Sequence, residues 1–170
     1  MKNIFLIAAI LFSAAANAQI TKATLQASGL TCSMCSNAIN KSLQTLAFVD
    51  KVEANIKNST FDIVFKSGSN TDFDMIKKKV EDAGFFVAGF TATVNFDNLT
   101  VDNDTHVNVG NNVFHFLNVK NQTLTGEKII RLLDKGFISA KEYKKNTSLT
   151  KMACYKTGDE NGKRIFHVTI

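Results

Sequence analysis

Cys32 and Cys35, two cysteines separated by two residues, are the pair whose type and spacing most directly indicate chemistry in this chain. They end the segment Gly-Leu-Thr-Cys-Ser-Met-Cys, with Cys32 in an expected loop and Cys35 in the first turn of an expected helix. The free N–H groups and partial positive charge of a helix N-terminus favour the thiolate form of cysteine. Two thiolates at this spacing can point at one centre, and a soft ion such as Cu(I) accepts two such ligands. The pair therefore predicts a soft-metal site that needs no third protein ligand.

Disulfide chemistry is the alternative for the same pair. A thioredoxin-type oxidoreductase normally has a cis-proline opposite its two cysteines, and this chain contains no proline. That absence argues against a thiol-disulfide redox protein. An inert structural disulfide, in a domain kept for another purpose, stays open as a second alternative.

The periodicity of residues 20–95 indicates the elements that would position the pair. Apolar and polar residues alternate in four segments, which is typical of strands, and two segments have the apolar spacing of helices. The expected strands are residues 23–27, 52–56, 61–65 and 86–94, and the expected helices are residues 34–46 and 73–83. Thr71 and Asp74 resemble a capping box, and Gly84 is expected to end the second helix. The order βαββαβ predicts a ferredoxin-like α+β domain, with both helices on one face of a four-stranded antiparallel sheet.

With these elements, residues 20–95 resemble the heavy-metal-associated domain of copper chaperones and copper-transporting ATPases. The pattern of that family is Gly-Met-Thr-Cys-x-x-Cys between the first strand and the first helix, and this chain departs from it at Leu30, an apolar exchange. The resemblance implies that Cys32 and Cys35 bind the metal. It covers less than half of the chain.

Three neighbouring residues are expected to support the site. Thr31 matches the threonine of the family pattern. Phe85 follows Gly84 as in many members of the family, and the resemblance implies that its ring shields the metal. Met34 lies between the two cysteines, where its thioether is expected to face solvent or a partner rather than the metal.

Cu(I) is the expected metal, with Hg(II) as the alternative, because exported members of the family include mercury-binding proteins. Zinc is disfavoured because it prefers four ligands, and residues 20–95 contain no histidine. The expected function is metal capture and handover rather than catalysis. The expected partner is a metal-donor or metal-acceptor protein such as a transporter or efflux component. An interaction or scaffold protein with a degenerate metal domain is the alternative from another class.

Residues 1–18 are expected to be a secretory signal peptide, because a charged start precedes a short apolar stretch and an Ala-x-Ala end. The apolar stretch is too short to span a bilayer, which needs about 20 residues. We therefore expect a soluble, exported protein, most simply periplasmic. The net charge of +5 is spread without a block of five like charges, which argues against nucleic-acid binding.

The rest of the chain is expected to form a second, β-rich domain. Residues 96–104 are polar and predict a linker after a metal domain at residues 19–95, and residues 105–170 predict a small β-barrel or sandwich. A second metal site is a candidate there because His, Met and Cys are copper ligands. Its candidate residues are His115, His167, Met152 and Cys154. The alternative is that the histidines are unrelated surface residues and that Cys154 is a buried free thiol.

Overall fold

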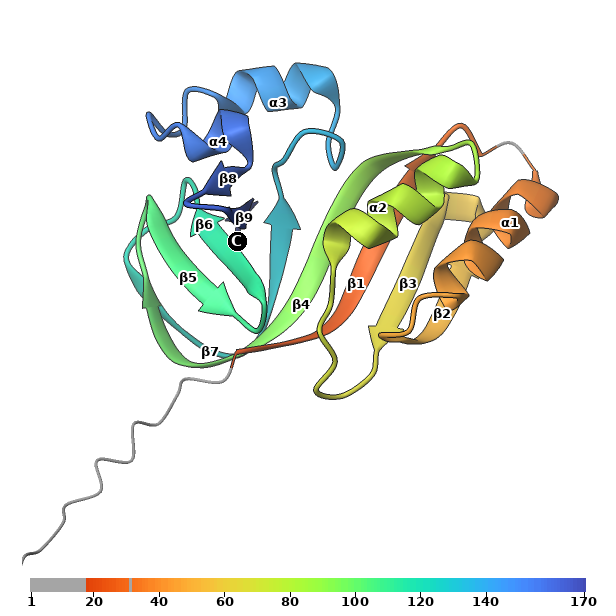
Figure 1. The fold of residues 1–170 in the computed structure, drawn as a ribbon, viewed down its shortest axis with the longest axis horizontal. Coiled ribbons are helices and arrows are strands. Elements are labelled where there is room, and N and C mark those ends of the chain that lie inside the picture. The colour runs from red at the N-terminus through yellow and green to blue at the C-terminus, as the bar shows by residue number, and fades with distance from the viewer. Residues whose placement is uncertain (1–17, 31) are drawn as a thin grey trace, which may run out of the picture.

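The computed structural model describes residues 18–30 and 32–170 (Figure 1). Residues 1–17 of the expected signal peptide, and Thr31, lie outside the described residues. Among the described helices, none has the length and apolar character needed to cross a bilayer. The helices are α1 (Ser33–Gln44), α2 (Phe73–Asp82), α3 (Ala140–Asn146) and α4 (Cys154–Thr157), with a short 3₁₀ turn, η1 (Ile56–Asn58). The strands are β1 (Gln19–Ser28), β2 (Val49–Asn55), β3 (Thr60–Phe65), β4 (Phe86–Val101), β5 (Thr105–Val109), β6 (Asn112–Phe116), β7 (Gln122–Leu132), β8 (Asp159–Glu160) and β9 (Lys163–Thr169).

The first half of the chain has the expected ferredoxin-like arrangement. Strands β2, β3, β1 and β4 lie side by side in that order and are antiparallel, and α1 and α2 cover one face of them (Figure 1). The capping residue of α2 is Asp72, whose carboxylate accepts the Met75 N–H at 3.0 Å, so the capping box expected at Thr71 is wrong by one residue. Gly84 follows the helix with a φ of 88°, a conformation that favours glycine, as expected for its end.

Strand β4 joins the two halves of the chain. Its 16 residues pair with β1 on one side and with β7 on the other, so one sheet runs through both halves. Residues 96–101 of the expected linker are therefore strand, and only residues 102–104 form a turn. A register shift between Phe96 and Leu99 breaks the alternation there, which explains why the pattern appeared to end early. The domain boundaries themselves stay a prediction.

The second half is β-rich, as expected, but its strands extend the sheet instead of closing a barrel or sandwich. The full order is β2-β3-β1-β4-β7-β9-β6-β5, an open path on which β6 and β9 are parallel neighbours. The sequence pattern predicts a strand over residues 152–156, but residues 154–157 form the helix α4. Helices α3 and α4 lie over this end of the sheet (Figure 1).

The two halves share one apolar core. Phe73 on α2 is fully buried, and its ring lies 5.0 Å from that of Phe90 on β4, 5.2 Å from Phe166 on β9 and 6.1 Å from Phe114 on β6. A helix of the first half therefore packs on strands of the second.

An ionic contact reinforces the same junction. The Nε of Arg164 on β9 donates to Asp74 on α2 at 2.7 Å, and its Nη1 donates to the buried Asp134 at 3.3 Å. The guanidinium also lies over the Phe166 ring, 4.1 Å from its centroid. Charge-assisted hydrogen bonds of this kind are stronger than neutral ones, so Arg164 ties α2 to the C-terminal strands.

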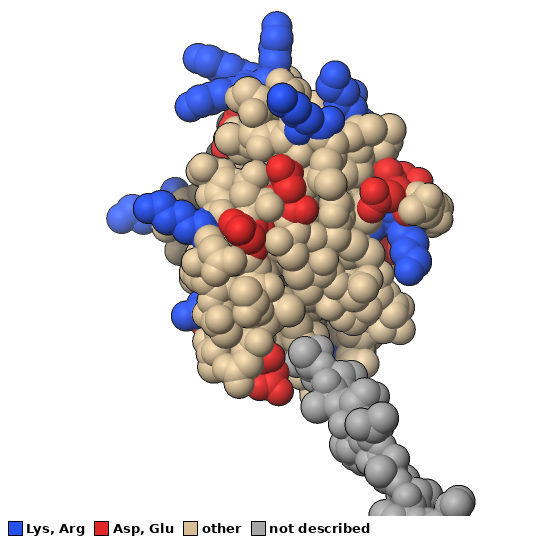
Figure 2. All heavy atoms as spheres, turned by 90° about the vertical axis from the view of Figure 1, so that its left-hand side faces the viewer, with Lys and Arg blue, Asp and Glu red and all other residues tan. Residues whose placement is uncertain are grey.

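Lysines from separate segments gather at one end of the molecule. Figure 2 shows Lys and Arg side chains concentrated at the end that carries α3 in Figure 1. The exposed lysines of α3, α4 and the segment between them are Lys141, Lys144, Lys145, Lys151 and Lys156. The charge that looks dispersed along the sequence is therefore concentrated on the C-terminal half.

Candidate metal centre

Cys32 and Cys35 lie at the N-terminus of α1, as the spacing predicts. Cys32 is the N-cap residue, and its Sγ accepts the Cys35 N–H at 3.3 Å. Sulfur at a cap position lies beside the free N–H groups of the first turn and the positive end of the helix, both of which stabilise a thiolate. The first turn of α1 carries no acidic residue that would oppose this effect. Cys32 is exposed and Cys35 half-buried, so the pair is accessible from solvent.

The two sulfur atoms are joined as a disulfide in the structure, with Cα atoms 5.4 Å apart. Both sulfurs are thus within reach of one small centre. A metal can bind between them only after the disulfide is reduced, since the thiolate is the ligand.

The sequence segments around the pair carry no charged side chain. Residues 28–40 and 84–89 contain no Asp, Glu, Lys or Arg. Leu30 and Phe85 are partly buried and pack against the core, and the shielding role expected for Phe85 stays a prediction. Met34 is 82% exposed and Phe86 is 70% exposed, and Met34 faces solvent as expected. Thr31 falls outside the described residues.

A family model described as the heavy-metal-associated domain matches residues 24–86. Those residues form a heavy-metal-associated domain. The match includes both cysteines and ends at the first residue of β4.

Known proteins resemble part of the chain. A copper-transporting ATPase of Helicobacter pylori is 39% identical over 57 residues, which are 34% of this chain and only 8% of that protein. The solution structure of the Atx1–Cu(I)–Ccc2a complex contains a chain that is 31% identical, with 38% of this chain and 88% of that chain covered and a TM-score of 0.34. Oxidized MerP from Ralstonia metallidurans CH34 is 25% identical, with 41% and 94% covered and a TM-score of 0.37.

Beyond the heavy-metal-associated domain, the structure brings the three histidines of the chain into one row. His106 on β5 is directly opposite His115 on β6, and His115 is directly opposite His167 on the other neighbour, β9. The ring centroids of His106 and His115 are 4.2 Å apart, and those of His115 and His167 are 5.1 Å apart. His115 and His167 are fully buried, so the alternative of unrelated surface histidines is wrong for both.

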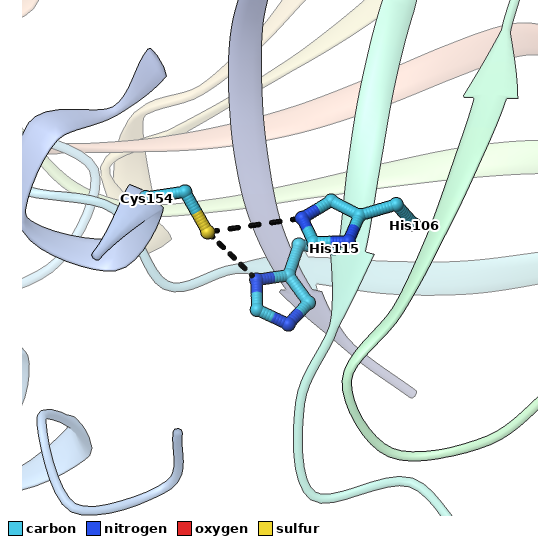
Figure 3. A group of neighbouring side chains, drawn as sticks. All are labelled: His106, His115 and Cys154. Carbon is cyan, nitrogen blue, oxygen red and sulfur yellow. Dashed lines mark hydrogen bonds between the residues drawn. The ribbon is translucent and has the colours of Figure 1, made fainter. Parts of the chain in front are cut away.

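Helix α4 places Cys154 against this row. The Cys154 Sγ lies 3.4 Å from His115 Nδ1 and 3.7 Å from His106 Nε2 (Figure 3). Of the four candidates for a second site, His115 and Cys154 are therefore brought together. His167 instead binds Asp134 through Nδ1 at 2.9 Å.

Met152 and Cys154 are two residues apart, which predicts that they share one face of a strand, and this prediction is wrong. Cys154 begins α4, whereas Met152 precedes that helix and is an exposed residue. Helix α4 could not be recognised in the sequence, because four residues are too few to show the helical period.

His106 is the residue that the sequence reasoning left out of the second site. Its position follows from the hairpin register: a two-residue turn at Gly110 and Asn111 puts Val109 opposite Asn112 and His106 opposite His115. The sequence pattern predicts a three-residue turn at residues 110–112, which shifts the register and separates the two histidines.

Proposed function

We propose that this protein captures one Cu(I) ion through the thiolates of Cys32 and Cys35 and hands it to a partner protein. The observation that carries the proposal is the accessible cysteine pair at the N-terminus of α1 in a heavy-metal-associated domain. Two thiolates satisfy Cu(I), whereas Zn(II) would need further ligands. The similarity to a copper-transporting ATPase supports this metal.

Binding requires a reductant and releases protons. Two thiols of a reducing partner convert the Cys32–Cys35 disulfide to two thiols and become a disulfide themselves. Cu(I) then replaces the two thiol protons, which pass to solvent. The reduced, metal-loaded form and the oxidised form are thus alternative states of the same pair.

Handover follows from the exposure of the site. A cysteine of the partner can reach a metal held at the surface and add a third sulfur ligand. One original metal–sulfur bond then breaks as each bond to the partner forms, so the ion is never left without ligands. Cys32 is the more exposed of the two residues and would exchange first.

The partner would dock without ion pairs. Met34 and Phe86 are large, exposed apolar side chains near an uncharged loop. Such a surface gains association energy from burial of apolar area rather than from charge pairing. A transporter or efflux component with its own heavy-metal-associated domain fits this description, as the similarity to a copper-transporting ATPase suggests.

Export to a periplasm is part of the proposal and rests on the sequence of residues 1–18.

Mercury is the alternative cargo, since Hg(II) also binds two thiolates. Cells that lack the gene would become sensitive to copper if copper is the cargo, and to mercury if mercury is.

A set of variants separates the two cysteine sites in a titration with Cu(I) and a competing chelator. The reduced Cys154→Ser protein is expected to bind one equivalent, and the Cys32→Ser/Cys35→Ser/Cys154→Ser protein none. Equal uptake by these two variants would contradict the proposal. Copper transfer from the loaded Cys154→Ser protein to a separate heavy-metal-associated domain would then demonstrate handover.

The Cys32–Cys35 disulfide makes a thiol-disulfide role the second candidate. Catalysed reduction of a small disulfide by the metal-free protein, lost in Cys32→Ser/Cys35→Ser, would favour it. No such activity is expected, because the chain contains no proline that could supply the cis-proline of thioredoxin-type sites.

A further inference from the structure

We propose that the C-terminal half binds a second copper ion through His106 Nε2, His115 Nδ1 and Cys154 Sγ. The three donor atoms come from β5, β6 and α4 and converge on one point (Figure 3). All three lie within 4.8 Å of one another. This site is separate from Cys32 and Cys35 and does not depend on the function proposed for them.

The spacing of the donor atoms fits a metal ion. With bond lengths of about 2.3 Å to sulfur and 2.0 Å to nitrogen, S···N separations are roughly 3.5 Å in a tetrahedral site and roughly 3.7 Å in a trigonal one. The observed separations from Cys154 Sγ are 3.4 Å to His115 Nδ1 and 3.7 Å to His106 Nε2. Both S···N separations therefore fit a bound metal ion, and the two nitrogens lie within 4.8 Å of each other.

A carboxylate orients the central ligand. His115 Nε2 lies 3.0 Å from Asp104 Oδ1. Donation of the Nε2 proton to this carboxylate leaves the lone pair on Nδ1, the nitrogen that faces Cys154. Metal-binding histidines commonly donate their other N–H to a carboxylate in this way, which fixes the tautomer and makes the ring a better ligand.

Burial keeps both inner ligands uncharged in the metal-free protein. Burial, with His106 and His167 nearby, lowers the pKa of His115 to about 4, so its ring is neutral at neutral pH. Burial also raises the pKa of the Cys154 thiol. The thiol proton can then be donated to His115 Nδ1. Copper binding replaces this proton, which leaves to solvent, and a Cu(I) thiolate carries no net charge into the buried site.

The number of donors favours copper over zinc. Cu(I) accepts three ligands, whereas zinc is almost always four-coordinate in structural sites. The group found among the described residues supplies three donors, two imidazoles and one thiolate. Glu160 is mostly exposed, and its Oε2 is 3.9 Å from His106 Nε2, so it is not held in place as a fourth ligand.

The edge of the sheet provides an entry path. Strand β5 is the last strand of the sheet, and the His106 side chain is 22% exposed, whereas His115 and Cys154 are buried. An ion would bind His106 first and then reach the inner pair.

Copper titration of the Cys32→Ser/Cys35→Ser protein tests this proposal without the first site. One equivalent of Cu(I) is expected to bind in competition with a chromophoric chelator. Adding Cys154→Ser or His106→Gln is expected to abolish that binding. The partial exposure of His106 makes His106→Gln the variant least expected to disturb folding, and far-UV circular dichroism checks this for each protein.

Two further variants are compared with this protein, one expected to weaken copper binding and one expected to leave it unchanged. Asp104→Asn is expected to weaken binding by roughly 10–100-fold, as for other carboxylates that hold a metal-binding histidine. Met152→Leu removes the sulfur of an exposed side chain two residues from Cys154, and it is expected to retain one equivalent.

X-ray absorption of the copper-loaded Cys32→Ser/Cys35→Ser protein is expected to show one sulfur and two imidazole nitrogens. Several results would overturn the proposal: no uptake, uptake that survives both Cys154→Ser and His106→Gln, or preference for Zn(II) over copper. The first site is measured separately in the Cys154→Ser protein, so failure of either proposal is visible independently of the other.

Discussion

Replacing Phe73 with alanine tests whether the two halves of the chain unfold as one unit. The Phe73 ring is fully buried and packs against Phe90 in the first half and against Phe166 in the second. Removal of a buried Phe side chain lowers the free energy of unfolding by about 3–5 kcal/mol. Loss of three aromatic pairs, with Phe90, Phe114 and Phe166, each worth about 0.5–1.5 kcal/mol, places the change near the upper end. For a chain of this size, 5 kcal/mol corresponds to a Tm lower by roughly 10–20 °C.

The tyrosines provide a probe for the second half alone. The chain has two tyrosines and no tryptophan, and both Tyr143 and Tyr155 lie in the C-terminal half. Their rings are 5.0 Å apart, and the Tyr155 hydroxyl donates to the Leu133 carbonyl at 3.1 Å. Tyrosine fluorescence therefore reports unfolding around α3 and α4, whereas far-UV circular dichroism reports the whole chain.

Both signals are expected to shift together in Phe73→Ala. A tyrosine transition that stays at the wild-type temperature while the circular dichroism transition falls would refute the shared core. Phe86→Ala is the matched control, since the same side chain is removed from an exposed position and the expected change is within about 0.5 kcal/mol.

Three other perturbations have defined outcomes. Burial opposes the ionisation of Asp74, but Arg164 outweighs it and holds the pKa of Asp74 below its usual value. Ionised Asp74 therefore stabilises the folded protein at pH values above its unfolded-state pKa, and this stabilisation is lost as the pH falls through the folded-state pKa. In urea unfolding, Asp74→Asn should be less stable than wild type at neutral pH and equally stable in strong acid. Gly84→Ala forces a φ of 88° on a residue with a Cβ and should lower the free energy of unfolding by about 1–2 kcal/mol. Met34→Ser/Phe86→Ser should slow copper transfer to a partner domain in stopped-flow measurements and leave the copper affinity unchanged, whereas a lower affinity would place these side chains in the metal site.

The heavy-metal-associated domain was predictable because its signals are local. The apolar stripe of α1 includes Ile39 and Leu43, which are fully buried. In β1 and β3, the alternation of apolar and polar residues indicates directly which side chains face the core. The cysteine pair lies at the junction of two such elements, so its position at the helix N-terminus follows from sequence order alone.

The single sheet through both halves, and the cluster of His106, His115 and Cys154, depend on contacts between residues that are distant in sequence. The pairing of β6 with β9 brings His115 beside His167, about fifty residues away, and neither strand pattern specifies that partner. The approach of Cys154 depends on how α4 packs over the sheet. Only the His106–His115 pair is encoded locally, in the length of one hairpin turn.

Whether copper binds between the two thiolates of α1 is tested most directly by X-ray absorption spectroscopy of the reduced Cys154→Ser protein with one equivalent of Cu(I). The expected spectrum has two sulfur neighbours and no nitrogen neighbour, because Cys32 and Cys35 supply both ligands. Nitrogen or oxygen ligands in the first coordination shell, or copper that separates from the protein on gel filtration, would contradict a copper site at this pair.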